Sequence, residues 1–157
     1  MILLGKAYQT INRVLEKFMV IIFSLLIVDV LAQVFSRYLL SYSPSFTEEF
    51  ARFSLIWLSL LGMAYLTGQR EHLTMDYVYQ KFSEQNKKKA TIFIESIIIL
   101  FATVVMLIGG GNLVYITLDL GQLSSALQIP LGYVYMVVPV SGLLIVFYSI
   151  HNISKVS

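Results

Sequence analysis

The chain has 157 residues, of which 57% are hydrophobic and only 13% are charged. Soluble globular chains carry roughly 45–50% apolar and about 25% charged residues. A soluble fold of this size has too little interior to hide so much apolar surface, so lipid must cover the remainder. The mean hydropathy of +0.78 and the lack of cysteine exclude a disordered tail and a disulfide scaffold. A net charge of +2, made up of few and scattered charges, excludes a nucleic-acid binder.

Four stretches with few or no charges predict the membrane spans, because about 20 apolar residues cross the hydrocarbon core as a helix. In chain order, we expect transmembrane helices over residues 18–37, 46–67, 92–117 and 133–151. Pro130 and a polar stretch before it keep the fourth helix from starting earlier. The sequence therefore predicts an all-α integral membrane protein, with residues 1–157 forming a single membrane domain.

A short amphipathic helix is expected between the second and third spans, over about residues 74–84. Met75, Val78, Tyr79 and Phe82 recur at helical spacing, while charged and amide side chains take the opposite face. Such a helix is suited to lie in the membrane interface. The alternative for this segment is a merely polar loop.

The basic residues predict the orientation, because Lys and Arg are enriched in cytoplasmic segments. Nine of the 11 lie on one side of a four-helix topology, in the N-terminal segment, the connection between the second and third spans, and the C-terminal tail. The connection between the third and fourth spans has none. We therefore expect both termini in the cytoplasm.

The first span contains an acid, Asp29, which is expensive to bury in lipid. Asp29, Gln33 and Arg37 are spaced by four residues and line one helix face. Folding the hairpin about residue 41 brings Asp29 and Arg52 to about the same depth. We predict that the first two helices are antiparallel neighbours joined by an Asp29–Arg52 ion pair. The alternative is that Asp29 binds a proton, an ion or a substrate.

Other polar residues are weaker candidates for chemistry. Glu48 and Glu49 are adjacent, so on a helix their side chains point about 100° apart and cannot easily share a catalytic or metal site. His72 and Asp76 are four residues apart but have no third metal ligand, so we expect a hydrogen-bonded pair at the interface. The sequence shows no nucleophile with a base, no metal cluster and no cofactor motif. Neither an enzyme nor a cofactor is therefore expected.

Small and aromatic residues suggest packing surfaces. Gly109, Gly110 and Gly111 in the third span and Pro139 in the fourth predict a tightly packed, kinked helix pair, or else a close contact with another chain. Trp57 lies in the middle of the second span and is expected to fill a packing surface. Four helices are few for a complete carrier with inverted repeats. The residues alone thus indicate a small membrane protein that is a subunit of something larger.

Three segments of the chain form a recognisable pattern in their order and spacing. They are Ser45-Phe46-Thr47-Glu48-Glu49-Phe50-Ala51-Arg52 followed by Trp57 and Gly62, then Gln69-Arg70-Glu71-His72-Leu73-Thr74-Met75-Asp76, and finally Ser124-Ser125-Ala126-Leu127-Gln128-Ile129-Pro130 followed by Tyr135 and Pro139. Together, these segments resemble the small membrane subunit (DctQ-type) of tripartite ATP-independent periplasmic (TRAP) transporters. Phe46 stands where the family often has Trp, which preserves an interfacial aromatic. The resemblance covers about residues 12–150. It marks as candidates for a partner interface Glu48, Glu49, Arg52, Trp57, Gly62, His72, Pro130 and Pro139.

The resemblance implies a multi-pass protein of the bacterial cytoplasmic (inner) membrane that works in a three-part system. A soluble periplasmic binding protein would capture an organic acid, of the C4-dicarboxylate or sialic acid class. A large subunit, expected as a separate chain, would carry the acid with Na⁺ by an elevator motion. This chain would brace the large subunit and help to dock the binding protein, with lipid around it and no cofactor or nucleic acid of its own.

Two hypotheses from other classes remain open at this stage. One is a small self-sufficient four-helix carrier of the multidrug type, which would use Asp29 in its first helix as the transport acid. The other is a membrane enzyme, for which the sequence offers no reactive residues.

Overall fold

The computed structural model describes residues 2–40, 45–69 and 84–156, and the described chain is almost entirely helical. Its elements are α1 (Ile2–Leu40), α2 (Ser45–Gln69), α4 (Glu84–Phe101), the π-helix η2 (Ala102–Gly109), α5 (Gly110–Asp119), α6 (Leu131–Tyr135) and α7 (Val137–Val156). Helices α4, η2 and α5 follow one another without a break, as do α6 and α7 across the single residue Met136.

Four of these helical stretches are long and apolar enough to cross a membrane, judged by length and composition. They run over Tyr8–Leu39, Ser45–Gln69, Asn86–Asp119 and Leu131–Lys155. Each helix predicted from the sequence lies inside one of them, so the all-α class and the four spans are confirmed. The helices continue past the predicted ends because charged and polar residues outside the hydrocarbon still favour helix. The predicted interfacial helix over 74–84 lies outside the described residues, except for Glu84, which begins α4.

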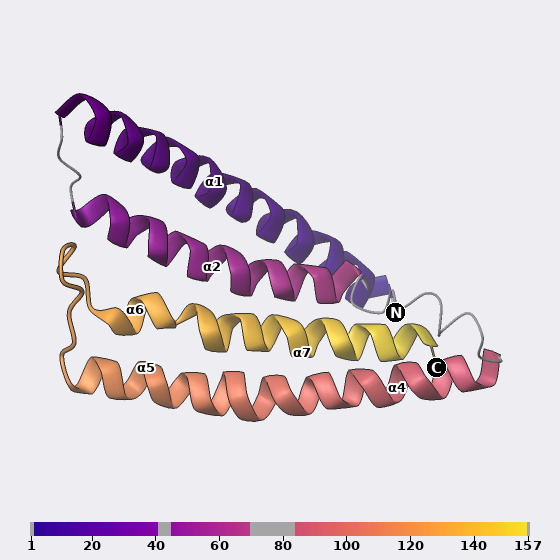
Figure 1. Ribbon diagram of the computed structural model, residues 1–157. Helices are drawn as coiled ribbons and strands as arrows, with labels where there is room; N and C mark the ends of the chain where they lie inside the picture. Colours follow the sequence, from indigo (N-terminus) through magenta and orange to yellow (C-terminus); the bar gives the residue numbers. More distant parts are fainter. Residues whose placement is uncertain (1, 41–44, 70–83, 157) are drawn as a thin grey trace.

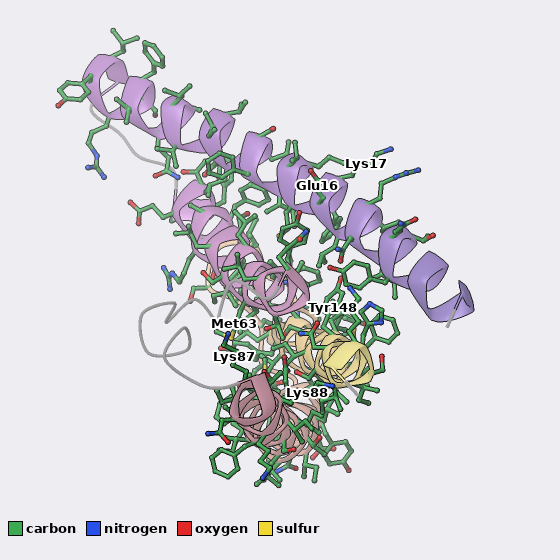
Figure 2. The ribbon with its side chains drawn as sticks, turned by 90° about the vertical axis from the view of Figure 1, so that its right-hand side faces the viewer. Glu16, Lys17, Met63, Lys87, Lys88 and Tyr148 are labelled. Carbon is green, nitrogen blue, oxygen red and sulfur yellow. The ribbon has the colours of Figure 1, made fainter. Side chains whose placement is uncertain are left out.

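The four spans lie side by side in a single layer, in the order α1, α2, α7 and α4–η2–α5 (Figure 1). Helix α7 packs against α2 on one side and against α4 and η2 on the other, while α1 packs against α2. The view along the layer shows the same row, with α1 crossing its neighbours obliquely (Figure 2). Helix α7 is therefore the central element, and the start of α1 and the end of α7 lie at the same end of the layer (Figure 1).

Helix α1 presents a narrow seam to the rest of the layer. Its buried and partly buried residues from Leu15 onward alternate steps of four and three, which is the heptad spacing of a helix that packs along one stripe. The members of this seam are Leu15, Met19, Ile22, Leu26, Asp29, Gln33 and Ser36. Away from this seam α1 is open: only 6% of its most apolar 18-residue stretch is buried. Lipid or another chain must cover the remainder.

The third and fourth spans approach so closely that only glycine fits at their contacts. A Cβ atom added at Gly110 would lie 2.7 Å from Cγ1 of Val138 and 3.3 Å from Cδ of Pro139, and one added at Gly142 would lie 2.8 Å from Cβ of Met106. The predicted tight pair of helices is thus confirmed at Gly110. Gly111 has no atom within 4 Å of its added Cβ, so it leaves room for another chain.

Two neighbouring glycines allow a matched test of this packing. We expect Gly110→Ala to lower the free energy of unfolding by about 1–3 kcal/mol, because the added methyl overlaps Val138. Gly111→Ala should leave it unchanged or raise it by up to about 1 kcal/mol, because the site is open and alanine favours helix. Thermal unfolding of both variants in detergent micelles measures the difference, and equal effects would contradict the packing described above.

Candidate functional site

The connection between α5 and α6 is an ordered loop with a defined backbone. Leu123 and Pro130 pair as an antiparallel bridge, and the amide of Ser124 donates to the carbonyl oxygen of Ile129 at 2.9 Å. The amide of Ile129 donates in return to Oγ of Ser124 at 3.3 Å. Gln128 turns the chain with φ of +55°, a left-handed conformation that few residues other than glycine adopt. These contacts point the amides of residues 125–127 in one direction.

Glu49, near the start of α2, binds this loop through its carboxylate. Oε1 accepts the amide hydrogen of Ser125 at 3.0 Å, and Oε2 accepts those of Ala126 and Leu127 at 2.8 Å each. Consecutive backbone amides around one carboxylate form an anion-binding concavity, and hydrogen bonds to a charged acceptor are among the strong ones. Glu49 is buried at 7% exposure. It therefore fastens the α5–α6 loop to α2 across 76 residues of sequence.

Glu48 points away from Glu49, as predicted from their adjacency. Its Oε1 lies 3.8 Å from Nη2 of Arg37 at the end of α1, and both side chains are more than half exposed. An exposed ion pair of this kind contributes about 0–1 kcal/mol. The two carboxylates thus serve different neighbours and do not form one site.

The predicted Asp29–Arg52 ion pair is not formed in the described chain, so that prediction is wrong. Asp29 Oδ2 instead accepts a hydrogen bond from Nε2 of Gln33 on the same helix, at 2.8 Å. The reason is depth: Asp29 lies 11 residues before α1 ends at Leu40, whereas Arg52 lies seven residues after α2 begins at Ser45. The four-residue difference corresponds to about 6 Å along the helices. The two helices also stand apart at this end (Figure 1).

Trp57 joins three elements in the layer. Its ring Nε1–H donates to the carbonyl oxygen of Val134 in α6 at 3.1 Å, and its ring lies 6.0 Å from that of Phe18 in α1, centroid to centroid. Trp57 also lines an apolar cavity of about 330 Å³ between α1, α2, the α5–α6 loop and α6. The predicted packing role is confirmed, and the hydrogen bond adds to it.

The other residues that the family resemblance marks as candidates for a partner interface lie in several different parts of the structure. Pro130 closes the bridge of the loop and directly precedes α6, and Pro139 packs near Gly110. Gly62 has no atom within 4 Å of an added Cβ, so α2 is open there. Arg52 is exposed on α2. His72 and Asp76 lie outside the described residues, so their predicted hydrogen-bonded pair stays a prediction.

A buried polar contact joins α2, α4 and α7 near the end of the layer where the chain begins and ends. Nδ2 of Asn152 in α7 donates to the carbonyl oxygen of Thr67 in α2 and to Oε1 of Glu95 in α4, at 3.0 Å each. Asn152 is 1% exposed and Glu95 is 2% exposed. One amide group thereby links three of the four spans.

An aromatic cluster beside it holds the first turns of α1 to the layer. The Tyr8 hydroxyl donates to the carbonyl oxygen of Gly68 at 2.8 Å, and the Tyr148 hydroxyl donates to Oδ1 of Asn12. The Tyr8 ring stacks on His151 at 4.7 Å between centroids. Gly68 is required here because an added Cβ would lie 2.9 Å from the Tyr148 ring. The side chain of Tyr148 is marked in Figure 2 between α7 and the crossing α1.

The sequence reasoning missed Glu95 and Asn152 altogether. A signal was present: Glu95 is the one acid inside the span predicted over 92–117, and Thr91 precedes it by four residues on the same helix face. An acid within an apolar span is rare enough to mark a special contact. Its partner, in contrast, lies 57 residues away, and no local pattern indicates it.

Several of the buried polar side chains among the described residues form hydrogen bonds between helices and loops, and they do not form a reaction centre. Over residues 2–40, 45–69 and 84–156, no group of three or more His, Cys, Asp or Glu side chains gathers to hold a metal ion. Four apolar spans whose buried polar groups bind neighbouring helices and loops define a helical integral membrane protein.

The family is then identified by comparison. The chain belongs to the DctQ component family of the tripartite ATP-independent periplasmic transporters, whose family model matches residues 8–156. It is accordingly the small permease component of a TRAP transporter, a multi-pass inner-membrane protein in a family of transport components, not of enzymes.

Curated relatives are small permease proteins of the same kind. The chain is 27% identical over 157 aligned residues to the ectoine TRAP transporter small permease protein TeaB of Halomonas elongata, covering 93% of this chain and 79% of that protein. A putative TRAP transporter small permease protein of Haemophilus influenzae is 24% identical, over 86% of this chain and 82% of its own length. The isethionate TRAP transporter permease protein DctMQ of Oleidesulfovibrio alaskensis is 30% identical over 60% of this chain, but the match spans only 15% of that protein.

The two adjacent glutamates give a second matched test. Glu49→Gln replaces one acceptor oxygen by an NH₂ group that meets backbone amides, so we expect it to lower the free energy of unfolding by about 1.5–3 kcal/mol. Glu48→Gln should change it by less than about 1 kcal/mol. Thermal unfolding, with limited proteolysis of the 120–130 loop as a local measure, distinguishes them. If the 120–130 loop of the Glu49→Gln variant resists proteolysis as well as the wild-type loop does, the Glu49 carboxylate does not hold that loop in place.

Proposed function

We propose that this chain is the scaffold subunit of a TRAP transporter and braces a large Na⁺-coupled subunit that imports an organic acid. The observation that carries the proposal is the arrangement of the helices. Four spans lie in one layer, so both broad faces of the layer stay open to a partner (Figure 1). A closed bundle would bury those faces against itself.

The interior of the layer supports a bracing role over a carrier role. Its middle is filled by two apolar clusters, which centre on Leu61 and Val137 and on Ala102 and Ile145. A carrier needs polar groups near the midplane to hold its substrate. Among the described residues, the contacts that Glu side chains make with other elements lie toward the two ends of the layer, at Glu48 and Glu49 and at Glu95.

The alternative of a self-sufficient carrier that uses Asp29 is not favoured. Asp29 is paired with Gln33 on its own helix, and the cavity beside α1 is lined by apolar side chains of Phe18, Ile22 and Leu25 one turn and more away. Membership of the DctQ family also supports a component of a larger system.

The substrate is proposed to be selected by other parts of the system. Relatives of this chain are named for ectoine and for isethionate, two chemically different solutes, although they resemble this chain to a similar degree. We keep the substrate as an organic acid, with C4-dicarboxylates and sialic acid as the classes that the family resemblance implies. A soluble periplasmic binding protein would deliver it, the large subunit would hold Na⁺, and this chain would hold no cofactor.

Transport assays test the scaffold proposal directly. The chain should co-purify in detergent with a larger membrane protein, and liposomes that contain this chain alone should show no uptake of ectoine, isethionate, succinate or sialic acid. Adding the co-purified partner and its binding protein should restore uptake of one organic acid in a Na⁺ gradient. Uptake by this chain alone would contradict the scaffold proposal and favour a self-sufficient carrier that uses Asp29. In that carrier, Asp29→Asn should abolish transport.

The proposed orientation places both termini in the cytoplasm and the α5–α6 loop outside. Support comes from the basic residues and from the shared end of α1 and α7 (Figure 1). Because the chain has no cysteine, single cysteines report accessibility without a background signal. A membrane-impermeant maleimide should label Gln122→Cys in intact spheroplasts but Lys155→Cys only after permeabilisation. The reverse pattern would show that the orientation is inverted.

A further inference from the structure

Among the described residues, no positive charge balances the buried carboxyl group of Glu95. The side chain is 2% exposed in a membrane span, and its Oε1 accepts one hydrogen bond, from the neutral amide of Asn152. Its Oε2 is buried and has no hydrogen-bond partner among the residues that the structure describes. A lone carboxylate in such surroundings is costly, and one neutral donor does not offset that cost.

The charged and titratable groups on the surrounding helices do not pair with Glu95. On α4 itself, Lys88 and Lys89 are exposed about two turns closer to the helix start, and Lys88 is marked there in Figure 2. On α7, His151 stacks on the Tyr8 ring, and Nζ of Lys155 lies 5.1 Å from the centre of that ring. On α2, the group that reaches this contact is the carbonyl of Thr67. Among the described residues, no basic side chain forms an ion pair with Glu95.

A second buried oxygen atom without a hydrogen-bond partner among the described residues lies on the side of α7 that carries Asn152. Ser149 is 0% exposed, and its Oγ has no hydrogen-bond partner in the described part of the chain. It precedes Asn152 by three residues, so the two side chains stand on neighbouring positions of one helix face. Oxygen atoms without hydrogen bonds are rare inside proteins, and each requires an explanation such as an unseen ion or water.

We propose that Glu95 is the centre of a binding site for a monovalent cation, either a proton or an alkali-metal ion, with Ser149 as a neighbouring oxygen. One positive charge balances one carboxylate, whereas a divalent ion would leave an uncompensated charge in the same buried place. Lone acids in membrane spans are by default candidates for such sites. This site is separate from the bracing role, because it lies within the chain's own packing and not on its open faces.

Occupancy of the site would decide how firmly the central helix is held. With the cation bound, the carboxyl group is neutral overall, and Asn152 can keep α2, α7 and α4 joined. Without it, a bare carboxylate draws water between α4 and α7 and weakens that contact. The site thereby couples cation binding to the stability of the layer at the end where the chain begins and ends.

Infrared spectroscopy of the full chain in lipid nanodiscs, labelled with ¹³C-carboxyl glutamate, tests the proposal on the wild-type protein. In buffer without Na⁺ or K⁺ at neutral pH, a protonated Glu95 gives a carboxylic-acid C=O band that shifts in D₂O. If the Glu95→Gln variant lacks this band, the band belongs to Glu95. A band in the wild type that is absent from the variant therefore shows that the bound cation is a proton.

If that band is missing, titration with NaCl and KCl against choline chloride at constant ionic strength tests the alkali-metal ion. We expect the melting temperature of the wild type to rise by several degrees with one of these ions and that of Glu95→Gln to stay constant. Asp119→Asn, which removes an exposed acid from the same continuous helix, is the matched control and should respond as the wild type does. A wild-type chain with only ionised carboxylates and no response to either ion would overturn the proposal.

Discussion

One side chain, Asn152, joins the central helix α7 to both of its neighbours, α2 and α4. In a membrane, apolar helix surfaces gain little by choosing each other over lipid, so hydrogen bonds and close backbone contacts decide which helices are neighbours. The amide of Asn152 provides such bonds to α2 and to α4 at once, from its position on the helix between them. The glycine contacts of Gly110 and Gly142 complete the fit of α7 against η2 and α5. The place of α7 between α2 and the third span follows, because both of these neighbours are fixed to it.

Glu49 has the equivalent role at the other end of the layer, where it binds the backbone of the α5–α6 loop. The two ends are therefore rigid and polar, and the middle is apolar and open on both faces. This distribution suits a component that must keep its shape while a larger partner works beside it. It also accounts for three buried polar side chains, Glu49, Glu95 and Asn152, each of which connects elements far apart in the sequence.

The residues that carry the family resemblance divide into two groups. Glu49 and Trp57 face inward and bind the loop and α6, so their part in the pattern is explained by the fold of this chain alone. Arg52 and Gly62 lie open on α2, and Glu48 reaches only across to Arg37 on the surface. The fold of this chain does not account for this second group. The segment that carries the resemblance thus combines buried residues that stabilise the fold with residues exposed on its surface.

Hydropathy by itself determined the number of spans, their order and their approximate positions, because the length of an apolar helix is set by the thickness of the membrane. The family could be recognised from the order of short motifs, and the separate directions of Glu48 and Glu49 followed from helix geometry. Tertiary structure alone decided the partners. The pairing of Asp29 with Arg52 failed because a shift of four residues in depth moves two charges about 6 Å apart. The contacts of Glu49 and Glu95 depend on loop conformation and helix neighbours, which link residues more than 50 positions apart and leave no periodic trace in the sequence.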